Sequence, residues 1–189
     1  CCKKYNASLV TAHHQDDLVE TAIINLLRGT GWRGLAPMSA QRPTKLLRPL
    51  LDTPKSTILD YAKKYNLQWR EDSTNNDQTY LRNYVRQKLI PTMQQQDADV
   101  VEKFLKTIES TTRLKKEITT ELQSILYPQI SNTKYQIFEY PRYSFIMWPS
   151  GVAREVIYQI LTNLDPDWHP TTQQLERALH FIKTGRADK

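Results

Sequence analysis

The residues best suited to chemistry lie in one short stretch, His13-His14-Gln15-Asp16-Asp17-Leu18-Val19-Glu20-Thr21. Asp17 and Glu20 are three residues apart, so a helix would place their carboxylates next to each other on one side. Two neighbouring carboxylates repel unless a cation lies between them. Oxygen ligands of this kind suit Mg²⁺ that carries the phosphates of a nucleotide. The stretch therefore predicts a site for a metal-bound nucleotide at the start of a helix.

Two other interpretations of this stretch stay open. Acidic residues at the start of a helix complement the helix dipole, but capping alone does not require the pair His13-His14. Both histidines with Asp17 could also bind zinc. No later His or Cys cluster completes such a zinc shell, because His169 and His180 lie in a distant segment.

A second candidate segment is Arg28-Gly29-Thr30-Gly31-Trp32-Arg33-Gly34-Leu35, which holds three of the five glycines in the chain. Glycines gathered in this way predict positive φ or a close approach of the backbone to a ligand. Arginines among them fit phosphate contacts. An ordinary helix C-cap followed by a turn explains Gly29, but it does not explain Gly31 and Gly34 together with both arginines.

A third candidate segment runs from the polar loop Asp72-Ser73-Thr74-Asn75 into the stretch Tyr80 to Arg86. Arg82 and Arg86 are four residues apart and would share one helix face, with Asn83 beside them. Such a pair could clamp phosphates or a developing negative charge. A surface helix with a basic face is the simpler alternative.

These motifs need a scaffold, and the apolar pattern predicts one of alternating strands and helices with a parallel sheet. Strands are expected over residues 7–12, from residue 46 until Pro49, and over residues 67–69. One helix is expected over residues 16–28. A second should begin after Thr53, which would cap it, with Pro54 in its first turn. A third is expected over residues 80–89, before Pro91. The first strand should be buried and should end at His13, at the usual ligand-binding edge of an open α/β sheet.

The second half of the chain has a different character. Apolar residues keep a helical period from about 97 to 126, which predicts a helix roughly 40 Å long. Residues 134–147 have a β-like pattern, and helices are expected over 151–164 and 171–183. We therefore expect two domains, over residues 1–93 and 94–189.

The composition favours a folded protein with a polyanionic partner. The chain carries a net charge of +6 with a pI of about 9.3, and six basic residues between Arg28 and Lys55 accompany the single acid Asp52. No apolar run approaches the roughly 20 residues that span a bilayer. The neighbouring Cys1 and Cys2 offer no disulfide framework, which fits a reducing cytoplasm.

In this order the segments resemble the tRNA(Ile)-lysidine synthetase family of ATP-pyrophosphatases. The family pattern contains His-His-x-Asp-Asp-x-x-Glu-Thr, a glycine-rich stretch, Arg-Pro-Leu-Leu, Asp-x-x-Asn, and Arg-Asn-x-x-Arg followed by Pro. Its counterparts here are His13–Thr21, Leu27–Leu35, Arg48–Leu51, Asp72–Asn75, and Arg82–Arg86 with Pro91. The strong resemblance runs from about residue 9 to residue 93.

The resemblance implies an α/β fold class: a partial parallel-sheet, adenine-nucleotide-hydrolase-like (PP-loop) domain over residues 1–93. A long linker helix and a small, mainly helical tRNA-binding domain would follow over 94–189, which resembles the family only in layout. The implied reaction uses ATP and Mg²⁺ to adenylate the C2 oxygen of the wobble cytidine in a tRNA(Ile) with a CAU anticodon. Free L-lysine then attacks C2 and expels AMP, which gives lysidine.

The resemblance also implies roles for individual residues. The catalytic set is Asp17, Glu20, Arg82 and Arg86, of which Asp17 and Glu20 would bind Mg²⁺ through ATP. The ATP-binding set is His13, His14, Asp16, Asp17, Arg28 and Gly29. The tRNA-binding set is Arg33, Arg48, Asn75 and Asn83. Which carboxylate binds Mg²⁺ and which acts on lysine does not follow from the sequence.

The chain departs from the family at one motif. The phosphate loop Ser-Gly-Gly-x-Asp-Ser, which follows the first strand in the family, should lie upstream of Cys1, and the chain has no such segment. We therefore expect a fragment that by itself binds ATP poorly and does not turn over. Its sheet should lack the first strands and leave apolar surface exposed.

Three alternative functions remain. A non-catalytic tRNA-binding module would use the basic segments and the helical second half. Another ATP-pyrophosphatase, such as a tRNA thiolase, would need cysteines for sulfur transfer, and Cys1-Cys2 is not a CxxC pair. A metal-dependent hydrolase would use His13, His14 and Asp17.

Overall fold

The computed structural model describes residues 5–42, 46–70, 79–125, 140–165 and 168–185 of the chain. They divide into two compact units, unit 1 over Cys1–Lys115 and unit 2 over Lys116–Lys189. The domain boundary expected after residue 93 stays a prediction. Among the described residues, no helix is long and apolar enough to cross a membrane.

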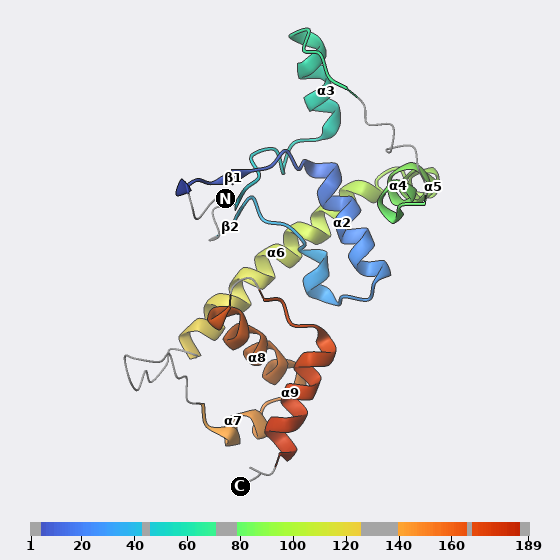
Figure 1. Ribbon diagram of the computed structural model, residues 1–189. Coiled ribbons are helices and arrows are strands. Elements are labelled where there is room, and N and C mark those ends of the chain that lie inside the picture. The colour runs from blue at the N-terminus through green and yellow to red at the C-terminus, as the bar shows by residue number, and fades with distance from the viewer. Residues whose placement is uncertain (1–4, 43–45, 71–78, 126–139, 166–167, 186–189) are drawn as a thin grey trace. The chain divides into compact units, whose positions relative to one another are not determined.

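Unit 1 contains a small sheet with helices around it (Figure 1). The strands are β1 (Leu9–Val10), β2 (Gln41–Arg42) and β3 (Leu46–Leu47), in the order β1-β3-β2. The pair β1 and β3 is parallel, with Leu9 opposite Leu46, whereas β2 and β3 are antiparallel. The helical elements are α2 (Gln15–Leu27), the 3-10 helix η1 (Trp32–Leu35), α3 (Lys55–Lys64), α4 (Leu81–Tyr84), the π-helical turn η3 (Val85–Leu89), α5 (Ile90–Gln96) and α6 (Val100–Ile125).

The predicted first strand forms but is not buried. Leu9 and Val10 are 51% and 59% exposed, because β1 lies at an edge of the described sheet and pairs only with β3 there. The prediction of a buried strand is therefore wrong, while the expected exposed apolar surface is present at this edge. The expected strand over residues 67–69 does not form either, since none of the described strands pairs with this segment.

The core of unit 1 is built around one face of α2. Leu18, Val19, Ala22, Ile23 and Ile24 are buried there, as their helical spacing requires. Elements from three other parts of the chain complete this cluster, through the buried residues Leu51, Val85 and Ile108. Helix α2 is thus held firmly, and its first turn carries the acidic residues.

Two helix ends differ from the prediction. The N-cap of α3 is Pro54 rather than Thr53. Pro54 makes no side-chain hydrogen bond that would cap the helix. The helix expected to stop at Pro91 instead continues through α5 to Gln96. The π-helical turn η3 changes the hydrogen-bond register directly before Pro91, whose ring would otherwise collide with the carbonyl four residues earlier.

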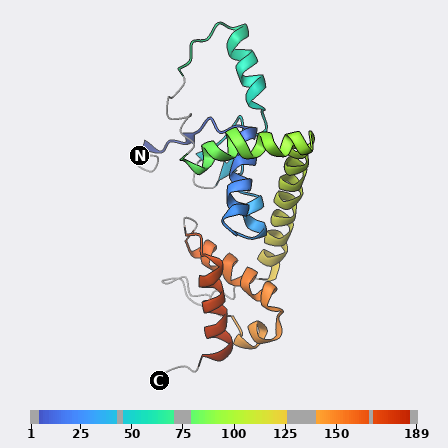
Figure 2. The same ribbon diagram turned by 90° about the vertical axis from the view of Figure 1, so that its right-hand side faces the viewer.

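Unit 2 is helical in its described part. After the C-terminal end of α6 come α7 (Arg142–Met147), α8 (Ser150–Leu164) and α9 (Thr172–Thr184), shown in orange to red in Figure 2. Its core gathers Leu122, Phe145, Ala153, Val156, Ile157 and Leu179. The predicted helices over 151–164 and 171–183 and the long helix before them are confirmed.

The β-like pattern over residues 134–147 is wrong where the structure describes it. Residues 142–147 form α7, and Phe145 packs edge-on against Trp148 with ring centroids 5.2 Å apart. Burial of that one aromatic ring in a helical core overrides the local β propensity. Residues 134–139 lie outside the described part.

Candidate active site

The first turn of α2 is fixed by backbone contacts. Gln15 N–H donates to the Thr53 carbonyl over 3.0 Å, and the backbone N–H of His14 donates to Asp17 Oδ2, also over 3.0 Å. Asp16 Oδ2 accepts from the backbone N–H of Lys55 over 2.8 Å. Asp16 therefore caps α3 from outside that helix, and the acidic corner ties the starts of α2 and α3 together.

Glu20 lies one turn further along α2 and is only 1% exposed. It is flanked by the apolar residues that form the core of unit 1. A carboxylate removed from water in this way costs much free energy unless a cation and hydrogen bonds compensate it. The residues that pair with the Glu20 carboxylate are therefore central to this site.

Arg86 supplies that compensation from η3. Its Nε donates to Glu20 Oε1 over 2.6 Å and its Nη2 donates to Glu20 Oε2 over 2.9 Å, which is the bidentate geometry that suits guanidinium and carboxylate. Nη2 also lies 3.5 Å from Asp17 Oδ1. The hydrogen bonds to Glu20 raise the pKa of Arg86 above its ordinary value against the opposing effect of burial, so this guanidinium stays charged at any physiological pH.

Arg82 completes the cluster from α4. Its Nε lies 3.3 Å from Glu20 Oε2, an ion-pair distance without hydrogen-bond geometry. Its Nη2 donates to the Thr21 hydroxyl over 2.6 Å, and that hydroxyl donates to the Asp17 carbonyl over 2.7 Å. The structure therefore brings together all four residues of the predicted catalytic set.

Thr21 belongs to this cluster although the sequence analysis gave it no role. A signal was present, because Thr21 ends the His-His-x-Asp-Asp-x-x-Glu-Thr stretch and lies four residues after Asp17. That spacing lets a threonine hydroxyl bond back to the carbonyl one turn earlier. Its oxygen is then aimed at Arg82.

The cation between the two carboxylates is a guanidinium in this structure. The predicted role of Glu20 as a Mg²⁺ ligand stays a prediction, and it requires the bidentate pair with Arg86 to open. Asp17 has a looser set of partners. Within the described residues, no group of three or more His, Cys, Asp and Glu side chains is arranged to hold a metal ion, so an ion here would also need ligands from the nucleotide.

The two histidines lie at the same corner. His13 Nδ1 is 2.8 Å from the Thr11 hydroxyl. The ring nitrogens of His14 lie 3.5 Å from Asp16 Oδ2 and 3.5 Å from Asp17 Oδ2. His14 therefore adjoins both acids of the first turn.

The glycine-rich segment lies at the other end of α2. Arg28 is the C-cap of this 13-residue helix and Gly29 follows it, so about 20 Å of helix separates them from His14. The structure does not bring Arg28 and Gly29 to the acidic corner with the rest of the predicted ATP-binding set.

The glycines of this segment have local structural reasons. Gly29 and Gly31 adopt positive φ, 68° and 67°, which glycine tolerates best. A Cβ on Gly34 would lie 1.9 Å from the Thr30 hydroxyl and 3.1 Å from the Asn25 Cβ. The close approach predicted for this segment is therefore to its own helix, where Asn25 Nδ2 also donates to the Gly34 carbonyl over 3.0 Å.

The predicted tRNA-binding set does not form one surface. Arg48 is buried and donates from Nη1 to the Ser39 carbonyl over 3.0 Å, and Asn83 is buried too. Burial of these two side chains does not fit the predicted contacts with RNA. Arg33 is half-buried, with its guanidinium 5.0 Å from the Trp32 ring centre, and Asn75 lies outside the described residues.

The cluster lies in a part of the chain that is similar to known proteins. Residues 1–93 match the PP-loop domain. The chain is 30% identical over 164 residues to the tRNA(Ile)-lysidine synthase of Porphyromonas gingivalis, which is 83% of this chain and 36% of that protein. The proteins of the same name from Nitrosomonas europaea and Pseudomonas aeruginosa are 43% and 45% identical over 46% and 44% of this chain.

The matched proteins are much longer than this chain. It spans about a third of the Porphyromonas gingivalis protein and a fifth of the other two. The acidic corner, Arg82 and Arg86 all fall within residues 1–93, the part of the chain that matches the PP-loop domain.

Proposed function

We propose that the protein is an ATP-dependent ligase that modifies tRNA, because its residues 1–93 match the PP-loop domain, a type of domain that implies ATP binding. The substrate is a tRNA(Ile) with a CAU anticodon, whose wobble cytidine is adenylated at the C2 oxygen with release of pyrophosphate. The ε-amine of lysine then bonds to C2, loses a proton and displaces AMP. The supporting observation is the cluster of Arg86, Arg82, Glu20 and Asp17 at the start of α2.

Asp17 is the residue that fits a nucleotide-bound Mg²⁺ best. Among the described residues, its Oδ2 accepts from a backbone N–H and lies 3.5 Å from His14 Nε2, whereas its Oδ1 has the 3.5 Å contact with Arg86. Carboxylate oxygens with this freedom suit a hard cation. When bound, Mg²⁺ would offset the charge of the triphosphate.

Glu20 is assigned a positioning role. Both of its oxygens accept from Arg86, so it fixes the guanidinium and leaves little capacity for a metal ion. Arg86 and Arg82 then present fixed positive charge where negative charge develops on the phosphates during adenylation. Such groups need no rearrangement when the reaction occurs.

The test is whether the complete protein that contains these residues forms lysidine. The protein is incubated with ATP, lysine and a tRNA(Ile) transcript with a CAU anticodon, and lysidine is quantified by mass spectrometry of the digested RNA. Asp17→Asn should lower the rate about a hundredfold or more while binding of the tRNA stays within about twofold of wild type. Glu109→Gln, on the exposed face of α6, is the matched control and should keep the wild-type rate.

A non-catalytic tRNA-binding module is the second candidate, because the whole excess of positive charge lies in unit 1. Residues 1–115 hold eighteen basic and twelve acidic residues, whereas residues 116–189 hold eight of each. A binding module would bind the transcript and give no lysidine even as wild type. That result would overturn the ligase proposal.

The 189 residues taken alone are expected to bind ATP weakly. The sequence contains no Ser-Gly-Gly-x-Asp-Ser segment, and backbone N–H groups of such a loop provide much of the affinity for phosphates. Calorimetric titration of this chain with ATP and Mg²⁺ checks the expectation. Tight binding, comparable with the cellular ATP concentration or better, would contradict it.

A further inference from the structure

Helix α3 differs from the other long helix of the PP-loop domain, α2, because no residue of α3 is buried. In Figures 1 and 2 it stands apart from the other helices of unit 1. Despite this exposure it carries large aromatic side chains: Tyr61 and Tyr65 are 59% and 54% exposed. Leu67 and Trp69 follow the helix and are exposed to a similar extent. Grouped exposed apolar side chains of this kind indicate an interaction surface.

The aromatic rings of α3 lie against each other at a tilt. Tyr61 and Tyr65 are four residues apart and lie on one face, with ring centroids 4.5 Å apart and ring planes at 38°. The Lys64 ammonium lies 5.6 Å from the centre of the Tyr65 ring, within the range of a cation–π contact. We call Tyr61, Lys64 and Tyr65 the α3 face.

The charged side chains of α3 and of the residues directly after it indicate the kind of partner. Over residues 55–70 the chain has four basic residues, Lys55, Lys63, Lys64 and Arg70, and one acidic residue, Asp60. Protein–protein interfaces are depleted in lysine at their centres, whereas aromatic rings among basic side chains suit single-stranded nucleic acid. The positive charge meets the phosphates and the rings stack on the bases.

The α3 face is connected to the acidic corner by the contacts at the start of the helix. Asp16 Oδ2 holds the Lys55 N–H over 2.8 Å, and Tyr61 follows Lys55 by six residues, or about 9 Å along the helix axis. Asn66, two residues after the last residue of the helix, adopts φ of 51°, and Leu67 N–H closes the turn onto the Ala62 carbonyl over 2.9 Å. Trp69 and Arg70 follow this turn, so the aromatic and basic character continues past the helix.

We propose that the α3 face binds unpaired bases of an RNA loop by stacking, next to the base that reacts at the acidic corner. The inference rests on the proposed function for the identity of the RNA. The stacking itself requires only unpaired bases, because every base presents a π face. In double-stranded RNA the bases are stacked on each other, so their faces are not accessible for stacking with these rings.

The test compares two RNA probes on the full chain. The first is a fluorescein-labelled RNA hairpin with an unpaired loop of the CAU anticodon sequence, and the second is a blunt-ended RNA duplex with the same label. The double variant Tyr61→Leu/Tyr65→Leu should weaken binding of the hairpin at least about tenfold and change binding of the duplex less than twofold. Tyr143→Leu, at a comparably exposed tyrosine of α7, is the matched control and should bind both probes as wild type does.

Two further variants separate stacking from charge. Tyr61→Phe/Tyr65→Phe keeps the rings and should retain the wild-type affinity for the hairpin. Lys64→Gln should lower the slope of log affinity against log salt by about 0.7, the value for one phosphate contact to a single strand. Because all three side chains are exposed, circular dichroism and the melting temperature should match wild type in each variant.

Three results would overturn the inference: unchanged hairpin affinity in the leucine variant, equal loss for hairpin and duplex, or a wild-type dimer that the leucine variant abolishes. The last result would mean that a second copy of the chain covers the rings. The proposed function fails separately, because it needs lysidine production that depends on Asp17. Loop binding through the α3 face without lysidine would refute the ligase and keep this inference.

Discussion

Unit 1 and unit 2 are both held together by apolar clusters on helices, but they treat charge in opposite ways. Unit 1 buries Glu20 within its core and pairs it with two arginines. In the described part of unit 2, the ion pair Arg154–Glu176 lies on the surface, with both side chains substantially exposed. A buried ion pair rarely increases stability over an apolar core, so the cluster in unit 1 indicates a functional site.

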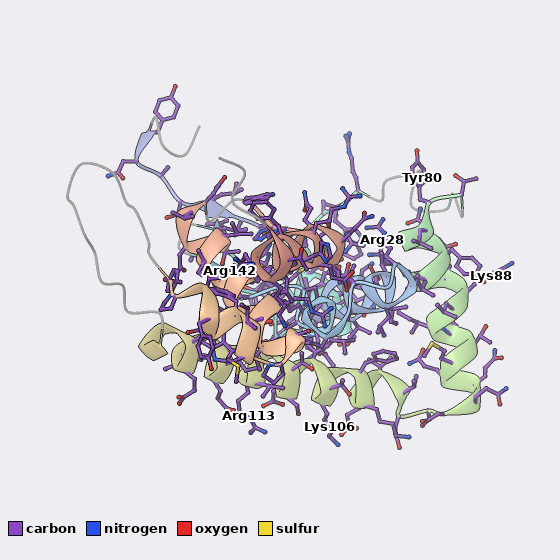
Figure 3. The ribbon with its side chains drawn as sticks, turned by 90° about the horizontal axis from the view of Figure 1, so that it is seen from below. Arg28, Tyr80, Lys88, Lys106, Arg113 and Arg142 are labelled. Carbon is purple, nitrogen blue, oxygen red and sulfur yellow. The ribbon has the colours of Figure 1, made fainter. Side chains whose placement is uncertain are left out.

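The same contrast extends to the surface. Unit 1 carries the whole net charge of +6, and unit 2 carries none. Figure 3 shows Lys88, Lys106 and Arg113 of unit 1 projecting outward from their helices. The match to the PP-loop domain, over residues 1–93, also lies within unit 1. Contacts with phosphates and RNA are therefore expected in unit 1.

The largest expected effect is a loss of stability in unit 2. Phe145 is buried against Trp148 and Tyr140, and Phe145→Ala should lower the free energy of unfolding of unit 2 by about 4 kcal/mol. Hydrogen exchange measured by mass spectrometry should show faster exchange in α7 to α9 and unchanged protection in α2. Equal loss of protection in both units would break the comparison.

The next effect concerns the buried ion pair. Glu20→Gln leaves Arg86 without its partner carboxylate and should cost about 3 kcal/mol of stability, measured by urea denaturation. The matched control is Glu176→Gln in unit 2, where loss of an exposed pair should cost less than about 1 kcal/mol. Equal costs would mean that the two ion pairs do not differ as burial indicates.

A pair of glycine substitutions gives a smaller effect with opposite signs in the two units. Gly34→Ala places a Cβ against Thr30 and Asn25 and should destabilise the protein by about 2 kcal/mol. Thr30→Ala in the same chain should recover part of that loss by removing the closest atom. Gly151→Ala in α8 meets nothing within 4 Å and should stabilise the protein by about 0.5 kcal/mol. Thermal melts of the four proteins check this, and a destabilised Gly151→Ala would contradict it.

The smallest effect is a dependence on acid pH at the start of α6. Asp97 pairs with Lys103, and this hydrogen bond holds the pKa of Asp97 below its ordinary value of about 3.9. The stabilisation is therefore complete above that ordinary value and is lost as the pH falls through the lower folded pKa. Asp97→Asn should flatten the stability of the protein against pH between about 2 and 5, and an unchanged profile would contradict the assignment.

The sequence predicted the site cluster well because helical spacing is geometrically strict. Asp17 and Glu20 are three residues apart, and Arg82 and Arg86 are four apart, so each pair had to share a face. That the four residues belong to one catalytic set was implied by the resemblance, since spacing within one helix carries no information about another helix.

The failures have physical causes that a single sequence does not display. Arg48 was expected to contact tRNA, yet its side chain is buried and donates to a backbone carbonyl. The end of the helix was placed at Pro91 because the π-helical turn before it has no sequence signal. Gly34 was assigned to a ligand approach, while the close neighbour is Thr30. In each case tertiary contacts override a local preference.

A double-mutant cycle between Glu20 and Arg86, measured on the rate of lysidine formation, tests the central claim most directly. If Glu20 acts only by fixing Arg86, Glu20→Gln and Arg86→Gln should lower kcat/KM by similar factors, and the double variant should be no slower than either. Rates are compared at a temperature where circular dichroism shows all four proteins folded. Independent effects that multiply in the double variant, or wild-type rates in both single variants, would contradict the account.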